Sequence, residues 1–305
     1  MRVIYFDCPT GASGDMIVAA LIDAGLSVDV LRDELAKLPL EGYRVDAKRV
    51  TRAGIAGTKF DVTVEGQETH RHLGHIVKIL DESDLSERVK RDSLAVFRRL
   101  AEAEARVHDT EVEKVHFHEV GAVDAIVDVV AAAVGLEKLG VREVICGALP
   151  TGSGFVRCAH GRLPVPAPAT AELLGGFPVA ASDLEAELTT PTGAAILTTL
   201  AARFGRRPAM TVETVGLGAG TQDFDDIPNL LRVFLGETAD VGDTDRVWVL
   251  ETNIDDMSAE LFETLFERLL ELGALDVFTT PVQMKKNRPA VMLSTLVPAA
   301  LRSRA

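Results

Sequence analysis

The segment from residue 115 to residue 139 constrains the fold of this chain more than any other. It begins Val-His-Phe-His-Glu-Val-Gly-Ala-Val-Asp and then becomes strongly apolar. Its apolar residues recur at helical spacing, which predicts a mostly buried helix that runs to about Leu139. These residues are Val123, Ile126, Val127, Val130, Ala131 and Val134.

Histidines and carboxylates are concentrated where this helix begins. His116 and His118 point to the same side if their stretch is extended, so both could bind one ion. Asp124 and Asp128 share one face of the helix, and a bare buried charge is prohibitively costly, so they must meet a cation, a donor network or water. With Glu119, they predict a metal or acid/base site at the start of this helix. The alternative is that Asp124 only caps the helix and complements its positive end.

Composition limits the classes of protein that remain. The chain has 305 residues, 47% of them apolar but only 5% aromatic, enough for one large or two ordinary domains with an aliphatic core. With 32 basic and 46 acidic residues the formal charge is −14, which argues against partners such as nucleic acid or anionic membranes. Residues 1–8 enter a strand directly, without the apolar stretch of a signal peptide, which predicts a cytoplasmic protein. Cys8, Cys146 and Cys158 are expected to be free thiols.

A glycine-rich loop joins the first predicted strand to the first predicted helix. It contains Ser13 and Gly14, and acidic residues Asp7 and Asp15 lie at its two ends. Its backbone N–H groups and the following helix N-terminus could bind an anion, with Ser13 as a hydroxyl donor and either aspartate available for a cation. The loop lacks the Gly-Lys-Ser/Thr ending of a Walker loop. A purely structural turn is the alternative.

The next part of the chain is predicted to be scaffold. It comprises strands at 44–50 and 59–64 and helices at 75–80 and 86–107. His70, His72 and His75 lie between these strands and helices in a polar segment. We expect them to form at most an accessory or loading site for metal.

A second loop region, residues 149–168, combines glycine and proline with a Cys-x-His pair. Cys158 and His160 offer a thiolate and an imidazole, which suit nickel, copper or zinc better than magnesium. Arg157 and Arg162 flank the pair and favour a nearby anionic ligand. Cys158 could instead be a small core residue. Further on, Thr190 is the predicted N-cap of a helix with Pro191 at its first position, and an anion on that N-terminus is the alternative.

A third glycine loop, residues 216–221, is not followed by a helix and so fails as a dinucleotide fingerprint. A strand is predicted at 229–235. The polar, acidic stretch from residue 236 to residue 245 then marks a domain boundary. It divides an N-terminal metal and substrate domain, residues 1–238, from the first part of a C-terminal nucleotide-binding domain, residues 245–305.

The second domain is predicted to begin with a strand, a helix and two more strands, at 246–252, 258–272, 274–280 and 291–297. Carboxylates follow the first strand, and a basic cluster follows the second strand. Carboxylates for a divalent ion beside a basic cluster for phosphates indicate a nucleoside triphosphate site; a solvated basic loop is the alternative. The residues are Glu251, Asp255, Asp256, Lys285, Lys286 and Arg288. The fold class expected is therefore α+β (mixed α/β), with a large N-terminal α/β domain followed by the start of a ferredoxin-like domain.

Taken together, these segments resemble the nickel insertion proteins that mature the nickel-pincer cofactor of lactate racemase, a family of cyclometallases. The resemblance covers nearly the whole chain. It is carried by the glycine loop, the histidine segment and the Cys-x-His region, and by further motifs at 164–170, 187–193, 218–221, 251–257 and 283–289.

This resemblance implies a CTP-dependent reaction that inserts Ni(II) into pyridinium-3,5-bisthiocarboxylic acid mononucleotide with the help of Mg or Mn. Formation of the nickel–carbon bond releases a ring proton, for which His118, Glu119 or Asp124 could be the base. The implied metal ligands are His116, His118, Asp124, Asp128, Cys158, His160, Asp255 and Asp256. Ser13, Gly14, Arg157 and Arg162 would bind the substrate phosphate, and Lys285, Lys286 and Arg288 would bind CTP. Assembly into an oligomer of identical chains stays open.

Two other classes of function remain open from the sequence. A nickel chaperone or storage protein would bind the metal without making bonds. A metal-dependent phosphohydrolase, using the carboxylates of Asp124, Asp128 and Asp255, would turn over nucleotide without any precursor.

Overall fold

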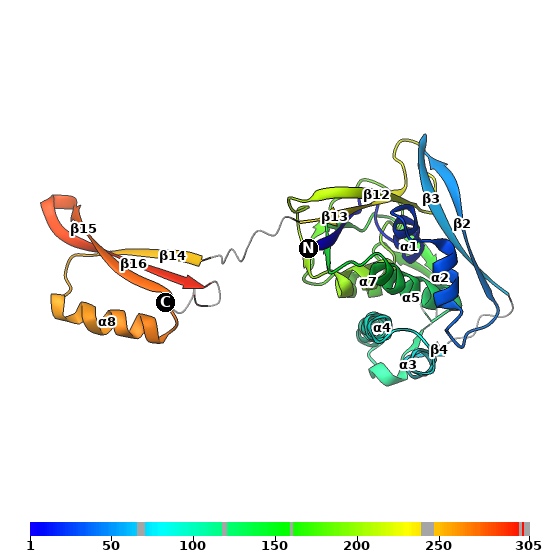
Figure 1. Cartoon of the computed structure of the whole chain (residues 1–305), viewed down its shortest axis with the longest axis horizontal. Coiled ribbons are helices and arrows are strands. Elements are labelled where there is room, and N and C mark those ends of the chain that lie inside the picture. Colours follow the sequence, from blue (N-terminus) through cyan, green and yellow to red (C-terminus); the bar gives the residue numbers. More distant parts are fainter. Residues whose placement is uncertain (66–70, 118–120, 159–160, 239–246, 299–300, 302–305) are drawn as a thin grey trace. The chain divides into compact units, whose positions relative to one another are not determined.

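The computed structural model describes residues 1–65, 71–117, 121–158, 161–238, 247–298 and 301. The chain divides into two compact units, residues 1–239 and 240–305 (Figure 1). The first unit combines a seven-stranded mixed sheet with helices, and the second has a three-stranded antiparallel sheet with one helix. The mixed α/β fold class predicted from the sequence is therefore confirmed.

The first unit contains most of the secondary structure. Its helices are α1 (Gly14–Asp23), α2 (Val28–Leu35), α3 (Leu73–Asp81), α4 (Glu87–Val107), α5 (Val123–Lys138), α6 (Pro168–Leu173) and α7 (Pro191–Leu200), with a 3-10 turn η1 (Val112–Lys114). Its strands are β1 (Arg2–Asp7), β2 (Tyr43–Arg52), β3 (Ile55–Val64), β4 (Arg71–His72), β5 (His116–Phe117), β6 (Glu143–Cys146), β7 (Leu149–Pro150), β8 (Phe155–Cys158), β9 (Gly161–Pro164), β10 (Val179–Ala180), β11 (Arg203–Phe204), β12 (Thr211–Ala219) and β13 (Leu230–Glu237).

The main sheet has the strand order β11-β6-β1-β13-β12-β3-β2. Strand β1 lies in its interior, parallel to β6 and antiparallel to β13. Strand β12 joins the β1 half to the β3–β2 hairpin, because it pairs antiparallel with β13 and parallel with β3. In the parallel pair, Thr58 of β3 lies opposite Gly218 of β12.

Helix α1 packs against the sheet over two glycines of β12. A Cβ atom at Gly216 would lie under 3.0 Å from the Ala20 carbonyl oxygen, and one at Gly218 would lie equally close to that of Met16. The two glycines alternate along the strand, so they face the same side. The prediction of a glycine loop at 216–221 is therefore wrong for most of its length: these glycines belong to a strand and allow a helix to approach closely.

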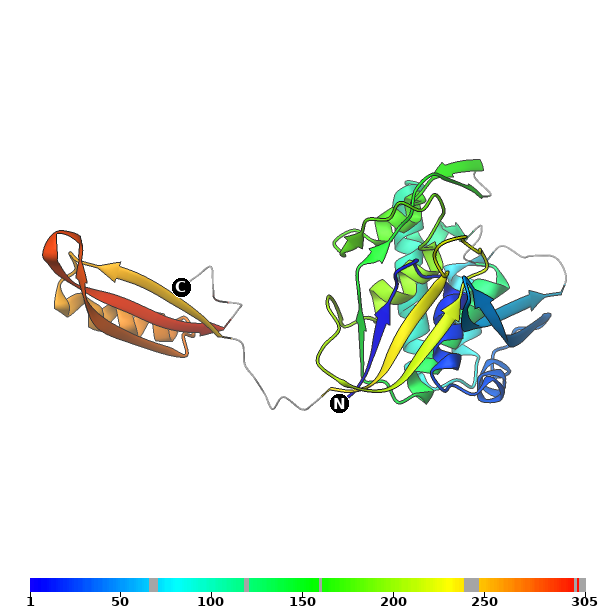
Figure 2. The ribbon, with the colours of Figure 1, turned by 90° about the horizontal axis from the view of Figure 1, so that it is seen from above.

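Helix α5 confirms the buried helix predicted from residue 123. It contacts α1, α2, α4, α7 and β3, so its apolar residues are covered on all sides. Helix α4 packs on α5, α6 and α7, away from the sheet, with its polar face outward. Figures 1 and 2 show these helices gathered on one side of the sheet.

Two short strand pairs depart from the predictions. The loop expected at 149–168 contains the β8–β9 hairpin, and Gly154 before β8 and Gly161 at the start of β9 both have positive φ angles. Strands β4 and β5 pair antiparallel, with His72 opposite His116. The two histidine segments, far apart in sequence, therefore lie on neighbouring strands.

The second unit consists of β14 (Val247–Ile254), α8 (Ala259–Glu271), β15 (Asp276–Met284), the turn η2 (Lys285–Asn287) and β16 (Arg288–Pro298). Strand β16 lies between β14 and β15 and is antiparallel to both. This arrangement is the start of the ferredoxin-like order that the sequence predicts. Its core is small, formed by Leu269, Val277 and Leu293 with partly buried neighbours.

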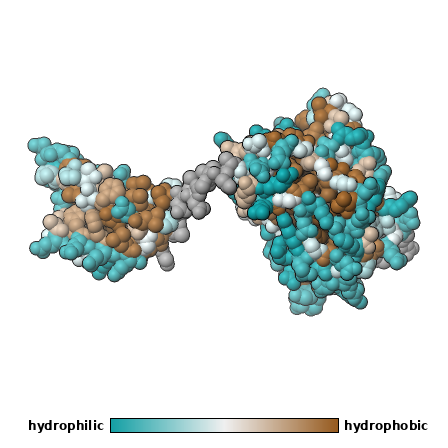
Figure 3. Space-filling view, in the orientation of Figure 1, coloured by the Kyte–Doolittle hydropathy of each residue, from teal (hydrophilic) through white to brown (hydrophobic). Residues whose placement is uncertain are grey.

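The second unit exposes several large apolar side chains. Figure 3 shows much apolar surface on the second unit, where Trp248, Val249 and Phe278 are exposed. Among the helices that the structure describes, none is both long enough and apolar enough to span a membrane. The cysteines Cys8, Cys146 and Cys158 are free, as predicted.

Candidate functional site

Three helices of the first unit begin at one pocket, which we call the helix mouth. Its volume is about 440 Å³, and its lining includes the first residues of α1, α5 and α7. Each helix N-terminus carries roughly half a positive charge from unpaired backbone N–H groups. The lining residues are Ser13, Gly14, Asp15, Lys59, Phe60, Asp61, Val62, Asp124, Ala125, Asp128, Glu187, Thr190, Pro191, Thr192 and Thr221.

The glycine loop is positioned by direct backbone contact with the segment before α7. The Ala12 N–H donates to the Leu188 carbonyl at 3.0 Å, and the Thr190 N–H donates to the Ala12 carbonyl at 3.0 Å. A Cβ at Gly11 or Gly193 would collide with this backbone. Thr190 caps α7, as predicted, by accepting from the Gly193 N–H at 3.2 Å. The glycines thus bring the N-termini of α1 and α7 together.

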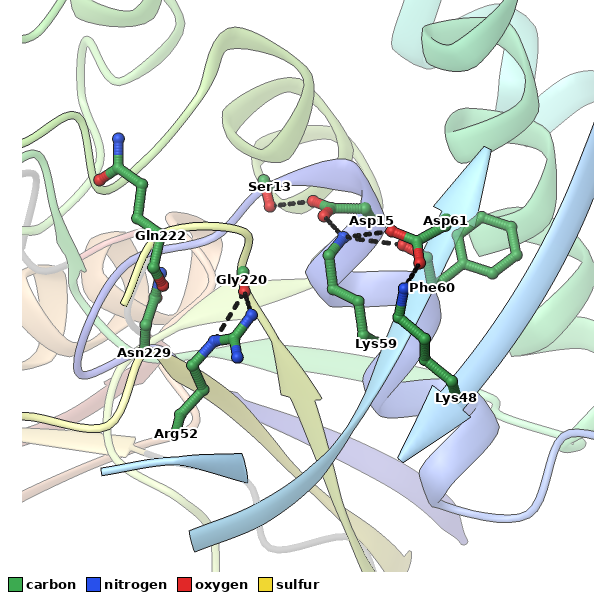
Figure 4. A network of polar contacts seen from close by, with 10 residues as sticks. All are labelled: Ser13, Asp15, Lys48, Arg52, Lys59, Phe60, Asp61, Gly220, Gln222 and Asn229. Atoms are coloured by element: carbon green, nitrogen blue, oxygen red, sulfur yellow. Dashed lines mark hydrogen bonds and ion pairs between the residues drawn. The ribbon is translucent and has the colours of Figure 1, made fainter. Parts of the chain in front are cut away.

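A buried lysine neutralises two of the carboxylates at the mouth. Lys59 Nζ lies 2.5 Å from Asp15 Oδ2 and 3.4 Å from Asp61 Oδ1, and its side chain is 8% exposed. Ser13 donates a short hydrogen bond to the other oxygen of Asp15, and Lys48 Nζ reaches Asp61 Oδ2 at 2.8 Å (Figure 4). The network therefore runs from the mouth to the surface of the β2–β3 hairpin.

Asp128 lies beneath the start of α1, in the space left by Gly14. A Cβ on Gly14 would lie under 3.0 Å from the Asp128 carboxyl group. Burial, and then the nearby Asp15 and Asp124 carboxylates, raise the pKa of Asp128 well above 3.8. The Asp128 Oδ1 atom is buried and has no hydrogen-bond partner within the described part of the protein.

Asp124 occupies the first turn of α5 and is exposed. Its Oδ1 accepts from the Ala125 N–H at 2.8 Å. The predicted shared face of Asp124 and Asp128 is confirmed, because both line the mouth. The N-cap position itself belongs to Ala122.

Two further cavities adjoin the mouth, and Glu187 lines all three. The first, which we call the adjoining chamber, has a volume of about 410 Å³ and shares Ser13, Asp15, Thr190 and Thr221 with the mouth. The second, which we call the thiol pocket, has a volume of about 420 Å³. It contains Cys158 and Arg157 beside apolar residues of the β8–β9 hairpin and α6.

The hairpin residues predicted as ligands are placed as follows. Cys158 is half-buried at the end of β8, and Arg157 is paired across the hairpin with Arg162. The Arg162 guanidinium lies 4.2 Å from the centre of the Phe155 ring, a cation–π contact. The sequence did not single out His108 and Glu104, which line the thiol pocket and form an ion pair at 3.4 Å when His108 is protonated.

Several predicted site residues fall outside the described residues. These are His118, Glu119 and His160, while His116 is described through its backbone in β5. Nearby, His72 Nδ1 lies 3.0 Å from the Val115 carbonyl oxygen. In the ranges that the structure describes, no group of three or more His, Cys, Asp or Glu side chains is arranged to hold a metal ion. The metal ligands proposed from the sequence stay predictions.

The second unit brings Asp255, Asp256 and the predicted basic residues to one end of its sheet, whereas the third predicted carboxylate, Glu251, lies within β14 and accepts a hydrogen bond from Ser294. Asp255 follows β14, and the η2 turn carries Lys285 and Lys286. Arg288 lies 3.5 Å from Asp255, joining the acidic and basic parts of the predicted nucleotide site. This donor set fits a triphosphate with a divalent ion, since lysine and arginine bind phosphate oxygens and carboxylates bind Mg or Mn.

Sequence reasoning missed Lys59, Asp61 and Glu187. Lys59 lies in the run of buried residues from Gly57 to Phe60. A charge in such a run requires a partner, which is the signal that could have found it. Glu187 gives no comparable signal, because its importance depends on which cavities meet beside it.

The fold and the mouth define a two-unit α/β protein with a pocket at converging helix N-termini. The family described as nickel insertion protein matches residues 4–304. A candidate nickel insertion protein of Geobacter sp. strain M21 is 56% identical over 301 residues, covering 98% of this chain and 78% of the relative. The chain therefore belongs to the nickel insertion protein family.

Two further relatives have more specific names. The pyridinium-3,5-bisthiocarboxylic acid mononucleotide nickel insertion protein of Desulfitobacterium hafniense is 49% identical over 304 residues, covering 98% of this chain and 75% of that protein. A solved structure, LarC2, is described as the apo C-terminal domain of a cyclometallase involved in the synthesis of the NPN cofactor of lactate racemase. The match is 42% identical in sequence and has a TM-score of 0.18. It covers 19% of this chain and 40% of the solved chain.

Proposed function

We propose that this protein inserts Ni(II) into pyridinium-3,5-bisthiocarboxylic acid mononucleotide in a CTP-dependent reaction that requires Mg or Mn. The observation that carries the proposal is the similarity, over nearly the whole chain, to a D. hafniense protein named for this insertion. The family match over residues 4–304 supports the same reaction class.

The chemistry of the mouth supports this assignment. The precursor carries a phosphate, and helix N-termini with nearby hydroxyl groups are favourable anion sites. The start of α7 supplies the hydroxyl groups of Thr190 and Thr192, whereas the Ser13 hydroxyl at the start of α1 already donates to Asp15. Lys59 pairs with Asp15 and Asp61, so these carboxylates repel an anion less than free carboxylates would.

Nickel–carbon bond formation requires a base, because the ring carbon that binds Ni(II) loses its hydrogen as a proton. Asp124 is exposed and lines the mouth, so it can reach a bound ring. His118 and Glu119 remain proposed bases from the sequence. Cys158, with His160, is proposed to hold nickel before it moves to the softer sulfur atoms of the precursor.

CTP is proposed to bind at the end of the second unit's sheet. Lys285, Lys286 and Arg288 would contact the triphosphate, while Asp255 and Asp256 would bind the divalent ion. The Arg288–Asp255 pair supports this site, since it places both kinds of group next to each other.

The test is nickel transfer to purified precursor with and without Mg-CTP, followed by mass and absorbance of the small molecule. The expected result is a nickel-bearing product that forms only when CTP is present. A variant in which His116 and His118 are both replaced by Ala is expected to lose insertion while keeping its circular dichroism spectrum.

Two results would contradict the proposal. Stoichiometric nickel on the protein without any product would support a chaperone or storage protein. Nucleotide turnover without precursor would support a phosphohydrolase.

A further inference from the structure

A cavity of about 430 Å³, which we call the arginine cavity, lies at the other end of α5 and α7 from the helix mouth. The last turns of these helices line it with Leu136, Thr199 and Leu200, whereas their first turns line the mouth. Leu136 lies about 18 Å further along α5 than Asp124, at about 1.5 Å per residue. The two sites are therefore separate. The other lining residues are Arg88, Arg91, Asp92, Arg142, Val144 and Ala202.

The arginine cavity is positively charged in an acidic protein. Three arginines and one aspartate line it, a formal excess of two positive charges in a chain whose formal charge is −14. Glu143, which follows Arg142 in the sequence, pairs with Arg203 at 3.1 Å. A concave surface with an excess of one sign of charge attracts ligands of the opposite sign, so this cavity favours an anion.

One carboxylate holds two of the arginines side by side. Arg91 donates to Asp92 Oδ1 from Nε at 3.0 Å and from Nη2 at 2.9 Å. Arg88 Nε lies 3.6 Å from Asp92 Oδ2, and Arg88 Nη2 donates to the Val141 carbonyl at 2.8 Å. Asp92 therefore orders both guanidinium groups at the cavity but balances only one of their charges.

The alternative for these arginines is a structural role, because cations complement the negative C-terminal ends of helices. This role accounts for Arg88, which donates to a backbone carbonyl after α5. It does not account for Arg142, which is exposed and whose guanidinium group has no hydrogen bond or ion pair within the described part of the chain. The five N–H donors of Arg142 are therefore available to a ligand.

A buried hydroxyl group in the cavity wall supports ligand binding independently of the charges. Thr199 Oγ1 is buried and has no hydrogen-bond partner among the described residues. The neighbouring Thr198 instead donates to the Ala194 carbonyl, one turn earlier in α7, at 2.7 Å. Leaving a buried polar atom without a partner costs free energy, so a ligand oxygen that accepts a hydrogen bond from Thr199 gains affinity.

The size and the apolar wall of the cavity indicate a small organic ligand that carries an anionic group. Its volume lies in the range of about 300–1,000 Å³ typical of small-molecule sites. Leu136, Val144 and Leu200 supply an apolar wall beside the arginines. Guanidinium groups match the oxygen pairs of both phosphates and carboxylates. A phosphate monoester, with a charge of about −1.5 to −2 at pH 7, matches the excess of positive charge better than one carboxylate does.

We propose that the arginine cavity binds the phosphate group of a small organic molecule. Arg91 and Arg142 contact the phosphate oxygens, and the Thr199 hydroxyl donates to one of them. The apolar body of the ligand packs against Leu136 and Leu200. This site goes beyond nickel insertion, and its test does not depend on whether insertion is observed.

The experiment is isothermal titration calorimetry on the full chain without divalent ions. The probe is phenyl phosphate, compared with inorganic phosphate and with benzoate. Each is titrated into the wild type and into Arg142→Ala and Thr199→Val. Arg268→Ala, on the exposed surface of α8, is the control for loss of a positive charge, and Arg288→Ala shows whether the probe binds to the second unit. Circular dichroism checks that each variant is folded.

We expect phenyl phosphate to bind the wild type about tenfold more tightly than either comparison compound, because it alone combines a doubly charged phosphate with an apolar body. Arg142→Ala should weaken this binding about tenfold and Thr199→Val about threefold. Thr199→Val should also keep or raise the melting temperature, since the hydroxyl group that it removes is buried without a partner. Arg268→Ala should bind like the wild type.

Equal affinity of the wild type and Arg142→Ala for phenyl phosphate would overturn the proposal. Binding that is lost in Arg288→Ala but kept in Arg142→Ala would also overturn it, because the probe would then lie on the second unit. Benzoate that binds as tightly as phenyl phosphate would contradict a phosphate ligand. A lower melting temperature of Thr199→Val with unchanged affinity would give its hydroxyl group a structural role and remove it from the site.

Discussion

The helix mouth of the first unit and the β15–β16 end of the second unit's sheet, which we call the hairpin end, both combine carboxylates with basic residues. The two sites differ in how far these charged side chains are buried. At the mouth, Lys59 is 8% exposed and contacts two carboxylates and a backbone carbonyl. At the hairpin end, Arg288 is 64% exposed and lies 3.5 Å from Asp255. One set of charges is built into the core, and the other remains open to solvent.

This difference indicates two kinds of binding. Because the lysine of the mouth, Lys59, is already paired with Asp15 and Asp61, its ligand must fit the other lining groups, Asp128 among them. The hairpin charges are hydrated and weakly paired, so they can rearrange around a triphosphate and a divalent ion at little cost to folding. Substitutions at the mouth should therefore disturb stability, whereas those at the hairpin should disturb binding.

The largest expected effect tests the rigid backbone beneath the mouth. Gly218→Ala would place a Cβ against the backbone of α1, so the free energy of unfolding should fall by about 3 kcal/mol. Urea unfolding measures this change. Gly74→Ala is the control, because Gly74 lies in α3 with open space around it and should be neutral or slightly stabilising. Equal stability of the two variants would contradict close packing of α1 on β12.

A matched pair of lysines tests whether burial makes the mouth's charges essential. Lys59→Met leaves Asp15 without its buried cation and should lower the free energy of unfolding by about 3 kcal/mol. Lys48→Met removes the other partner of Asp61, which lies on the surface, and should leave the melting temperature nearly unchanged. A similar loss in both variants would show that burial is not the cause.

The hairpin end is tested by binding. Arg288→Ala should weaken Mg-CTP binding about tenfold, since it removes one charged donor to phosphate, while the melting temperature stays constant. Isothermal titration calorimetry measures the affinity, and Arg268→Ala, on the exposed surface of α8, is the control. Unchanged affinity in Arg288→Ala would remove this residue from the CTP site.

The smallest effect concerns a charge pair between α2 and α5, outside both sites. Burial raises the pKa of Glu34, but hydrogen bonds from Lys138 and Lys37 outweigh it and bring the pKa below 4.5. Its contribution to stability is therefore full above pH 4.5 and is lost as the pH falls through the folded pKa. Glu34→Gln should cost about 1 kcal/mol at pH 7 and nothing at low pH. Thermal melts of both proteins from pH 3 to pH 7 measure this difference in stability. A difference that stays constant over this pH range would contradict a stabilising role of the ionised Glu34 carboxylate.

The elements with strong periodicity could be predicted from the sequence. Helices α4 and α5, strands β2 and β3 and the β14-α8-β15-β16 order follow from apolar spacing and turn residues. The glycines of β12 were misassigned because glycine marks loops locally, while here the reason for it is α1, which lies far away in the sequence. A local sequence pattern does not show this contact between distant segments.

Only the residues of the site that have a local sequence signature could be predicted. Ser13, Gly14, Asp124 and Asp128 could be found because glycine loops and acidic residues at helix starts have local signatures. Their convergence with Lys59 and Glu187 depends on the order of strands in the sheet, which a sequence pattern does not specify.

The dispersed origin of the mouth has a consequence for how the protein is made. Its lining comes from residues 13–15, 59–62, 124, 125, 128, 187, 190–192 and 221. A ribosome that adds about 5–20 residues per second must therefore extend the chain past Thr221, and expose that length from its exit tunnel, before the pocket can close. Until then the nascent chain carries Asp128 and the N-terminus of α1 without the environment that holds them. A pause in translation shortly after this point would give the first unit time to assemble before the second unit emerges.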